Sequence, residues 1–287
     1  MKRFYVVTLI TVITALGTGA PVQAQDSGAD RVTVSWSDPS RPGLIKVNLI
    51  QGGITVRTHN GRDVIIEGRS RVGGGRSGRA GRGNPPAEAG GLRRIDGSAS
   101  GLTVEEDNNV MSVSSQAFSR TVDLDIQVPA RTSLNLRTFN GGNISIEGVE
   151  GEIEVTNMNG GVTLTNVAGS VVAHSSNGRV VAAVRQVTTN KPMAFTSMNG
   201  NIDVTLPSSI KANIKMRTDN GEIYSDFDIQ LRPSATAPTI EDSRNRGGRY
   251  RIQLDKTMLG TVNGGGPEFD LRTMNGNIYI RRETGKD

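Results

Sequence analysis

The chain of 287 residues contains no cysteine, only 4% aromatic residues and two histidines. The absence of cysteine excludes disulfides, thiolate metal sites, iron–sulfur clusters, a cysteine nucleophile and a lipid-modified cysteine. The two histidines, His59 and His174, occupy different positions in the repeat described below, so they predict no metal site. Phosphate-loop, serine-hydrolase and zinc-protease motifs are also missing. We therefore expect no cofactor, no metal and no enzyme activity.

Long hydrophobic runs are absent except at the start of the chain. Lys2 and Arg3 precede an apolar run at 4–15, and small residues at Val22 and Ala24 complete a signal-peptidase site. Residues 1–24 are therefore predicted to be a signal peptide. An uncleaved anchor is the less favoured alternative, because the run is shorter than the ~20 residues that span a membrane. We expect an exported protein that is periplasmic, displayed on the cell surface or secreted, with no later membrane span.

What the sequence does contain is a repeat centred on Asn-Gly. Apolar residues stand six and four positions before each asparagine, which predicts a strand with one buried face. A small hydrogen-bonding residue stands two positions before it and predicts a polar ladder beside the turn. A spacing of 18 to 22 residues through the central part is typical of stacked repeats. The repeated asparagines are Asn60, Asn140, Asn159, Asn177, Asn199, Asn220 and Asn275.

A second apolar alternation follows each Asn-Gly, so each repeat holds two short strands. The fold class is therefore all-β, a parallel β-solenoid with coils of about 20 residues, two strands and Asn-Gly turns per coil. Asn-Gly suits such turns because both residues tolerate positive φ. An antiparallel meander is the alternative, since Asn-Gly is also a hairpin signal. The solenoid is favoured because equivalent positions keep their character from repeat to repeat.

The mature chain divides into an N-terminal β part of the solenoid, 25–130, and a repeat solenoid, 131–287. An Arg/Gly-rich insert at 69–94 contains seven arginines and one glutamate, while the mature chain as a whole has 31 basic and 28 acidic residues. The excess of base therefore belongs to this insert. A second loop insert is predicted at 231–249, and both inserts are expected to be mobile. Coils are expected to run without interruption over 130–227, with the C-terminal part closing the stack.

Arginine is the residue type that suggests a ligand. Three positions before the repeated asparagine stand polar or cationic residues, which stacking would align into an outward stripe that binds carboxylate, sulfate or phosphate groups. Pairing with nearby acids is the simpler interpretation and is favoured. The candidate ligand contacts are Arg57, Arg137, Arg217 and Arg272 of the stripe, with Arg76, Arg79 and Arg82 of the insert. The expected partners are an anionic glycan, lipopolysaccharide or an envelope protein; nucleic acid is not favoured for an exported chain.

Two other side-chain patterns carry weaker functional hypotheses. Carboxylate pairs at alternate positions could serve a polysaccharide lyase or hydrolase, although this spacing is normally the solvated side of a strand. The pairs are Asp123 with Asp125, Glu152 with Glu154, and Asp226 with Asp228. Phe139, Met158, Met198 and Met274 directly precede repeated asparagines. They could form an exposed binding stripe, but an apolar stack at the edge of the coils is favoured.

Several segments together resemble a bacterial family of exported "putative adhesin" β-strand-repeat proteins. They are the stretch SDPSRPG at 37–43 with the strands at 44–49 and 53–56, the run 128–141, the repeated Thr/Ser-x-Asn-Gly turns, and the run 262–280. The resemblance covers about 32–282. It implies a parallel β-solenoid and no known enzyme activity.

The function expected from the sequence is a non-catalytic, adhesin-like interaction module for an anionic cell-envelope or extracellular component. A polysaccharide lyase or hydrolase is one alternative. A structural spacer or assembly subunit is the other, and the sequence does not set the oligomeric state.

Overall fold

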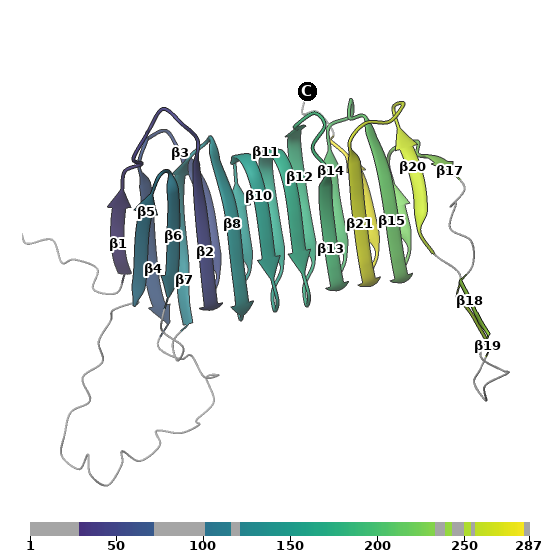
Figure 1. The fold of residues 1–287 in the computed structure, drawn as a ribbon, viewed down its shortest axis with the longest axis horizontal. Helices are drawn as coiled ribbons and strands as arrows, with labels where there is room; N and C mark the ends of the chain where they lie inside the picture. Colours follow the sequence, from purple (N-terminus) through teal and green to yellow (C-terminus); the bar gives the residue numbers. More distant parts are fainter. Residues whose placement is uncertain are drawn as a thin grey trace, which may run out of the picture.

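The computed structural model describes residues 29–71, 101–115, 121–232, 239–242, 250–253 and 256–283. The predicted signal peptide 1–24, most of the 69–94 insert with Arg76, Arg79 and Arg82, and part of the 231–249 loop lie outside these residues. The described chain is all-β, and its strands stand side by side in one elongated stack (Figure 1). In this part of the chain, no helix is long and apolar enough to cross a membrane.

The strands form two faces, which meet in β11 because its two halves belong to different faces. The first face has the stacking order β5 (Leu102–Asp107), β6 (Val110–Ser115), β2 (Gly43–Gln51), β8 (Thr132–Asn140), β10 (Glu150–Asn157), the end of β11 (Val162–Ser175), β13 (Met193–Asn199), β21 (Glu268–Asn275), β15 (Ala212–Asn220), β20 (Met258–Val262) and β17 (Gln230–Arg232).

The second face has the order β1 (Ala29–Val34), β4 (Val64–Arg71), β7 (Thr121–Pro129), β3 (Ile54–His59), β9 (Ile144–Glu147), the start of β11, β12 (Val180–Val187), β14 (Ile202–Leu206), β22 (Ile278–Arg282) and β16 (Ile223–Ser225). The central strands of both faces are parallel, and antiparallel pairs occur only toward the ends. A separate hairpin consists of β18 (Thr239–Asp242) and β19 (Tyr250–Gln253).

The core consists of rows of aliphatic side chains, one from each strand. In β7 every second residue from Val122 to Val128 is buried, as the alternation predicted. Leu134, Ile153 and Val171 occupy one register position on successive strands of the first face and are all buried. Each such side chain contributes about 1.5–3 kcal/mol by leaving water. Continuous rows of this kind stabilise the stack in place of the disulfides that the sequence excludes.

The order of the stack differs from the order of the chain at both ends. Strand β2 lies between β6 and β8, and β3 lies between β7 and β9. At the other end, β21 lies between β13 and β15, and β22 lies between β14 and β16. The expectation that the C-terminal part closes an uninterrupted stack is therefore wrong. All coils have the same apolar pattern, so the pattern alone could not indicate which coil occupies which level.

The first Asn-Gly pair does not belong to the common frame. Gln51, not Asn60, pairs with Asn140, and Ile54 pairs with Ile144 on the second face. The Gln51-Gly52 turn thus replaces Asn-Gly in this coil. Alternating strands look alike on both faces, and only the long-range register distinguishes them.

The remaining asparagines form a continuous hydrogen-bonded row, the asparagine ladder. In each step the Nδ2 of one side chain donates to the Oδ1 of the next over 2.7 to 3.0 Å. The order through the stack is Asn140, Asn159, Asn177, Asn199, Asn275 and Asn220. The asparagine is therefore needed at this position for its amide, which is both donor and acceptor.

The glycines of these turns are needed for space rather than for positive φ. Of the glycines that follow the ladder asparagines, only Gly141 has positive φ, and no ladder asparagine has it. A Cβ at Gly178 would lie 2.3 Å from the carbonyl oxygen of Gly160, and one at Gly200 would lie 2.4 Å from that of Gly178. The prediction based on turn conformation was wrong, because close stacking of successive turns imposes the glycine instead.

The predicted polar ladder beside the turn is confirmed. Its side chains are largely buried, and each donates to the carbonyl oxygen of a turn glycine in the neighbouring coil over 2.8 to 2.9 Å. The members are Thr138, Asn157, Ser175, Ser197, Thr273 and Thr218. Thr58 is not among them, because it lies on β3, which belongs to the second face.

Candidate functional site

Three loops meet where the inserted coil β2–β3 joins the stack. One loop leads into β2, the Gly61-Arg62 turn follows β3, and the link through Ala130 joins β7 to β8 past the inserted coil. The insertion itself brings these loops together, because the chain enters, leaves and crosses the same level of the stack. A cavity of about 150 Å³ lies between them.

The loop before β2 is held by the turn between β5 and β6. Ser37 donates its backbone N–H and its hydroxyl to the Glu106 carboxylate, over 3.2 and 2.7 Å. Asn109, a buried residue with positive φ, accepts from the Asp38 N–H over 2.8 Å and donates to the Asp38 carbonyl over 2.7 Å. These contacts fix the loop before any ligand arrives.

Hydrogen bonding also sets the charge of the two loop carboxylates. The Ser40 hydroxyl and N–H donate to Asp38 and lower its pKa below the ordinary value of 3.8, with help from the positive charge of Arg41. The Ser37 hydroxyl and N–H similarly lower the pKa of Glu106 below 4.5. Both carboxylates are therefore ionised at neutral pH, and their acceptor oxygens hold the loop.

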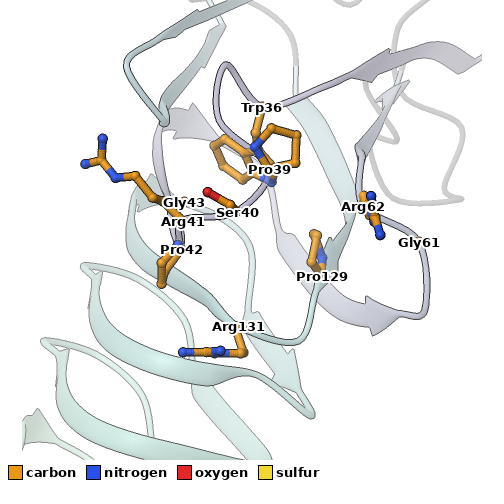
Figure 2. A pocket seen from close by; sticks show the side chains of 10 residues that line it. All are labelled: Trp36, Pro39, Ser40, Arg41, Pro42, Gly43, Gly61, Arg62, Pro129 and Arg131. Atoms are coloured by element: carbon orange, nitrogen blue, oxygen red, sulfur yellow. The ribbon is translucent and has the colours of Figure 1, made fainter.

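Trp36 is the apolar centre of the site. Its ring is 6% exposed and lies so close to Gly43 that a Cβ there would be 2.4 Å from it. Figure 2 shows Pro39 beside the Trp36 ring, and Pro42 and Pro129 complete the apolar part of the lining. Because Trp36 is buried, the exposed rings of Pro39 and Pro42 supply the apolar surface of the pocket.

Each of the three loops adds one arginine to the pocket: Arg41, Arg62 and Arg131. In Figure 2, Arg41 extends away from the Trp36–Pro39 pair to the left, Arg131 lies below the pair and Arg62 lies to its right. All three are exposed, and none makes an ion pair among the residues that the structure describes. We call this group, with Trp36, the three-arginine pocket. The charge of Arg41 already acts on Asp38, whereas Arg62 and Arg131 have no ion-pair partner among the described residues and remain available for an anion.

The arginine stripe predicted from the sequence is only partly assembled. Arg217 and Arg272 occupy the same register position on neighbouring strands, whereas Thr156, His174 and Thr196 separate them from Arg137. Arg57 lies on the second face, opposite Gln127 and Glu147, so its assignment to the stripe was wrong. The error has the same cause as the misassigned Asn60, namely the shifted register of the first coil.

Each of these arginines also has an acidic partner. The distances are 3.0 Å for Arg57–Asp125, 3.3 Å for Arg137–Glu154, 3.1 Å for Arg217–Asp219 and 3.4 Å for Arg272–Asp270. Such exposed pairs contribute little to stability. They do occupy the guanidinium groups, as the simpler interpretation of the sequence predicted.

The carboxylate pairs are likewise engaged within the stack. Asp123 accepts from the Gly53 N–H over 2.9 Å, and Asp125 is the partner of Arg57. Glu152 is paired with Lys191, and Glu154 accepts from Asn135 over 2.8 Å. Asp226 accepts from the N–H of Arg282 over 3.3 Å. Among the described residues, no group of three or more His, Asp or Glu side chains is placed to hold a metal ion.

Sequence reasoning missed the three-arginine pocket. The stretch 37–43 was noticed only for its resemblance to a family, and Arg62 and Arg131 stand outside the repeat frame. Their one common signal is a proline or glycine within two positions, as in Arg41-Pro42, Gly61-Arg62 and Pro129-Ala130-Arg131. That signal identifies loops but not which loops meet.

Residues 125–281 match the model of the Toastrack DUF4097 family, a domain of unknown function, and the chain belongs to that family. No curated protein matches the sequence.

The solved structures that are similar to this chain include two proteins described as adhesion proteins. One is a "putative cell adhesion protein" from Clostridium sporogenes, with 12% identity, a TM-score of 0.41, and coverage of 89% of this chain and 99% of the other. The other is a "putative adhesin" from Bacteroides fragilis, with 11% identity, a TM-score of 0.28, and coverage of 89% and 97%.

Proposed function

We propose that this protein is a non-catalytic, adhesin-like interaction module of the cell envelope, and that the three-arginine pocket binds an acidic glycan. The observation that carries the proposal is that Arg41, Arg62 and Arg131 line one pocket together with Trp36 and that none of them forms an ion pair within the described residues. Every arginine of the predicted stripe is paired by contrast, so the pocket replaces the stripe as the proposed anion site.

The chemistry of the pocket fits a sugar acid. Guanidinium groups donate paired hydrogen bonds to carboxylate, sulfate or phosphate oxygens. The exposed Pro39 and Pro42 rings, which lie over the buried Trp36, offer apolar surface for the carbon face of a sugar, and the arginines would hold its acidic group. The loop is fixed beforehand by Glu106 and Asn109, which lowers the entropy cost of binding. The basic insert at 69–94 would add long-range attraction that salt screens.

Trp36 is the only tryptophan in the chain and lies in the pocket, so its fluorescence reports binding directly. The mature protein is titrated with trigalacturonate and, as the neutral control, with a galactose trisaccharide. We expect saturable binding of trigalacturonate that weakens as salt is added, and little response to the neutral sugar.

Variants locate the site. Changing Arg41, Arg62 and Arg131 to Gln should weaken binding at least tenfold, since each charged hydrogen bond contributes about 1.5–3 kcal/mol. The matched control carries Arg57→Gln, Arg137→Gln and Arg272→Gln, which remove the same charge elsewhere, and should bind within about threefold of the parent. Equal binding by both variants would contradict the assignment of the pocket.

Reducing ends or unsaturated products in the same mixtures would contradict the non-catalytic proposal and favour a lyase or hydrolase.

A further inference from the structure

A column of side chains runs along the outer edge of the first face, directly beside the asparagine ladder. Its members each precede a ladder asparagine, and in stack order they are Phe139, Met158, Ser176, Met198, Met274 and Asp219. The three methionines are 38%, 48% and 47% exposed. Their thioether sulfurs are therefore displayed on the surface instead of filling the core.

Two soft donor atoms already converge in this column. The hydroxyl of Ser176 lies 3.5 Å from the Sδ of Met158 and 3.4 Å from the Nε2 of His174. Both atoms therefore lie close to the Ser176 hydroxyl, although Met158 and His174 come from neighbouring coils. Met198 occupies the column one level further on, about 4.8 Å away along the stack. Met158 lies one level before His174 and Met198 one level after it, so both methionine side chains would have to turn toward His174 to meet at one point.

The imidazole of His174 is already held in place. Its Nδ1 lies 2.7 Å from the hydroxyl of Thr196 on the next strand. With a proton on Nδ1 donated to that hydroxyl, Nε2 carries the free lone pair and faces the column. A hydrogen bond of this kind to the non-ligating nitrogen is how proteins orient metal-binding histidines.

The surroundings favour a soft cation of low charge. Thr156 and Thr196 flank His174 in register, so the two adjoining strands place neutral side chains beside it. Thioether sulfur is a soft ligand that selects Cu(I), whereas hard cations such as Mg²⁺ and Ca²⁺ require carboxylate or carbonyl oxygen. The chain has no cysteine to compete as a stronger soft ligand.

We propose that Met158, His174 and Met198 form a binding site for Cu(I), or for its redox-inert analogue Ag(I), on the edge of the stack. The ligands are the Sδ atoms of the two methionines and the Nε2 of His174. Met274, on the level after Met198, lies beside the site. This proposal is independent of the three-arginine pocket, since it uses other residues and other chemistry.

The competing explanation is an apolar edge stack without a ligand, and leucine substitution separates the two. Leucine keeps the apolar surface of methionine at similar volume but has no sulfur. The test variant is Met158→Leu with Met198→Leu. The matched control is Met258→Leu, because Met258 is 48% exposed but lies on β20, several levels of the stack away from Met158 and Met198. Circular dichroism confirms that each variant is folded.

The experiment titrates the mature protein with Ag(I) and follows methionine methyl signals by NMR. Cu(I) affinity is then measured anaerobically, with ascorbate and a competing bicinchoninate chelator. We expect one equivalent to bind, with shifts of the Met158 and Met198 methyl signals and none of Met258. Affinity should fall at least tenfold in the double variant and in His174→Gln, and stay within twofold in the control. The proposal is overturned if the parent protein binds neither ion, or if the double variant binds like the parent.

Discussion

The Nδ2 of Asn275 donates to the Oδ1 of Asn199 over 2.7 Å, although 76 positions separate the two residues in the sequence. The next ladder contact from Asn275 is to Asn220, over 2.9 Å. Asn275 therefore sits between two asparagines that are neighbours in the sequence repeat. The C-terminal coil is built into the stack, and both of its sides are paired.

The insertion of a coil near each end of the stack should affect both local stability and the folding rate. A terminal coil of a simple solenoid is paired on one side only and opens easily. Here the coils β2–β3 and β21–β22 are each paired on both sides. Long-range contacts of this kind slow folding, because the chain must close large loops before it gains the pairing energy.

The asparagine ladder should contribute measurably to stability. Asn177→Ala removes the contacts with Asn159 and Asn199, both 2.8 Å long, and should lower the free energy of unfolding by about 1–2 kcal/mol. Asn60→Ala is the control, because Asn60 stands outside the ladder, and it should change the value by less than ~0.5 kcal/mol. Urea unfolding of the two variants measures the difference. Equal effects would contradict the ladder.

Two glycine substitutions separate crowding from backbone conformation. Gly178→Ala places a Cβ 2.3 Å from a backbone oxygen of the neighbouring turn and should destabilise the protein by about 3 kcal/mol. Gly141→Ala meets no atom within 4 Å but holds alanine at a φ of +84°, which costs about 1–2 kcal/mol. Thermal unfolding followed by circular dichroism gives the order. A larger loss for Gly141→Ala would contradict the stacking argument.

The loop around Trp36 should loosen in acid. Asp38 and Glu106 have pKa values below their ordinary 3.8 and 4.5, so they stabilise the folded loop above those values. This contribution is lost as the pH falls through the lowered pKa values. We expect Trp36 fluorescence to change at pH below about 4, before the far-ultraviolet circular dichroism of the strands does. The change should shrink in Glu106→Gln, and a transition at neutral pH would contradict its assignment to these carboxylates.

Much of the fold could be predicted from the sequence, because buried positions are marked by apolar residues that alternate with polar ones along each strand. The alternation around Leu134 and Val155 identifies buried rows, and the hydroxyl of Ser175 identifies a polar position beside the turn. No local sequence pattern indicates the order in which the coils are stacked. Any coil with the same apolar pattern fits any level, so the sequence could not show that β21 lies beside β13.

The candidate sites were less predictable for a related reason. Arg41, Arg62 and Arg131 meet only because a coil is inserted, and no spacing along the chain reflects that. The methionine column was visible in the repeat frame, but its proximity to His174 was not, because the Ser176 hydroxyl that links Met158 to His174 lies in the next coil. The acidic partners of Arg137 and Arg272 were anticipated because they lie on the same or neighbouring strands.

The central claim, that the C-terminal coil is inserted into the stack, can be tested by disulfide cross-linking. The chain has no cysteine of its own, so an introduced pair has no competitor. Neighbouring strands lie about 4.8 Å apart, within reach of a disulfide, whereas two levels span about 9.6 Å and are out of reach. Asn199→Cys with Asn275→Cys should form a disulfide rapidly under mild oxidation, read by mass spectrometry. Asn199→Cys with Asn220→Cys should not. Cross-linking of the second pair but not the first would show that the coils follow chain order and would contradict the account.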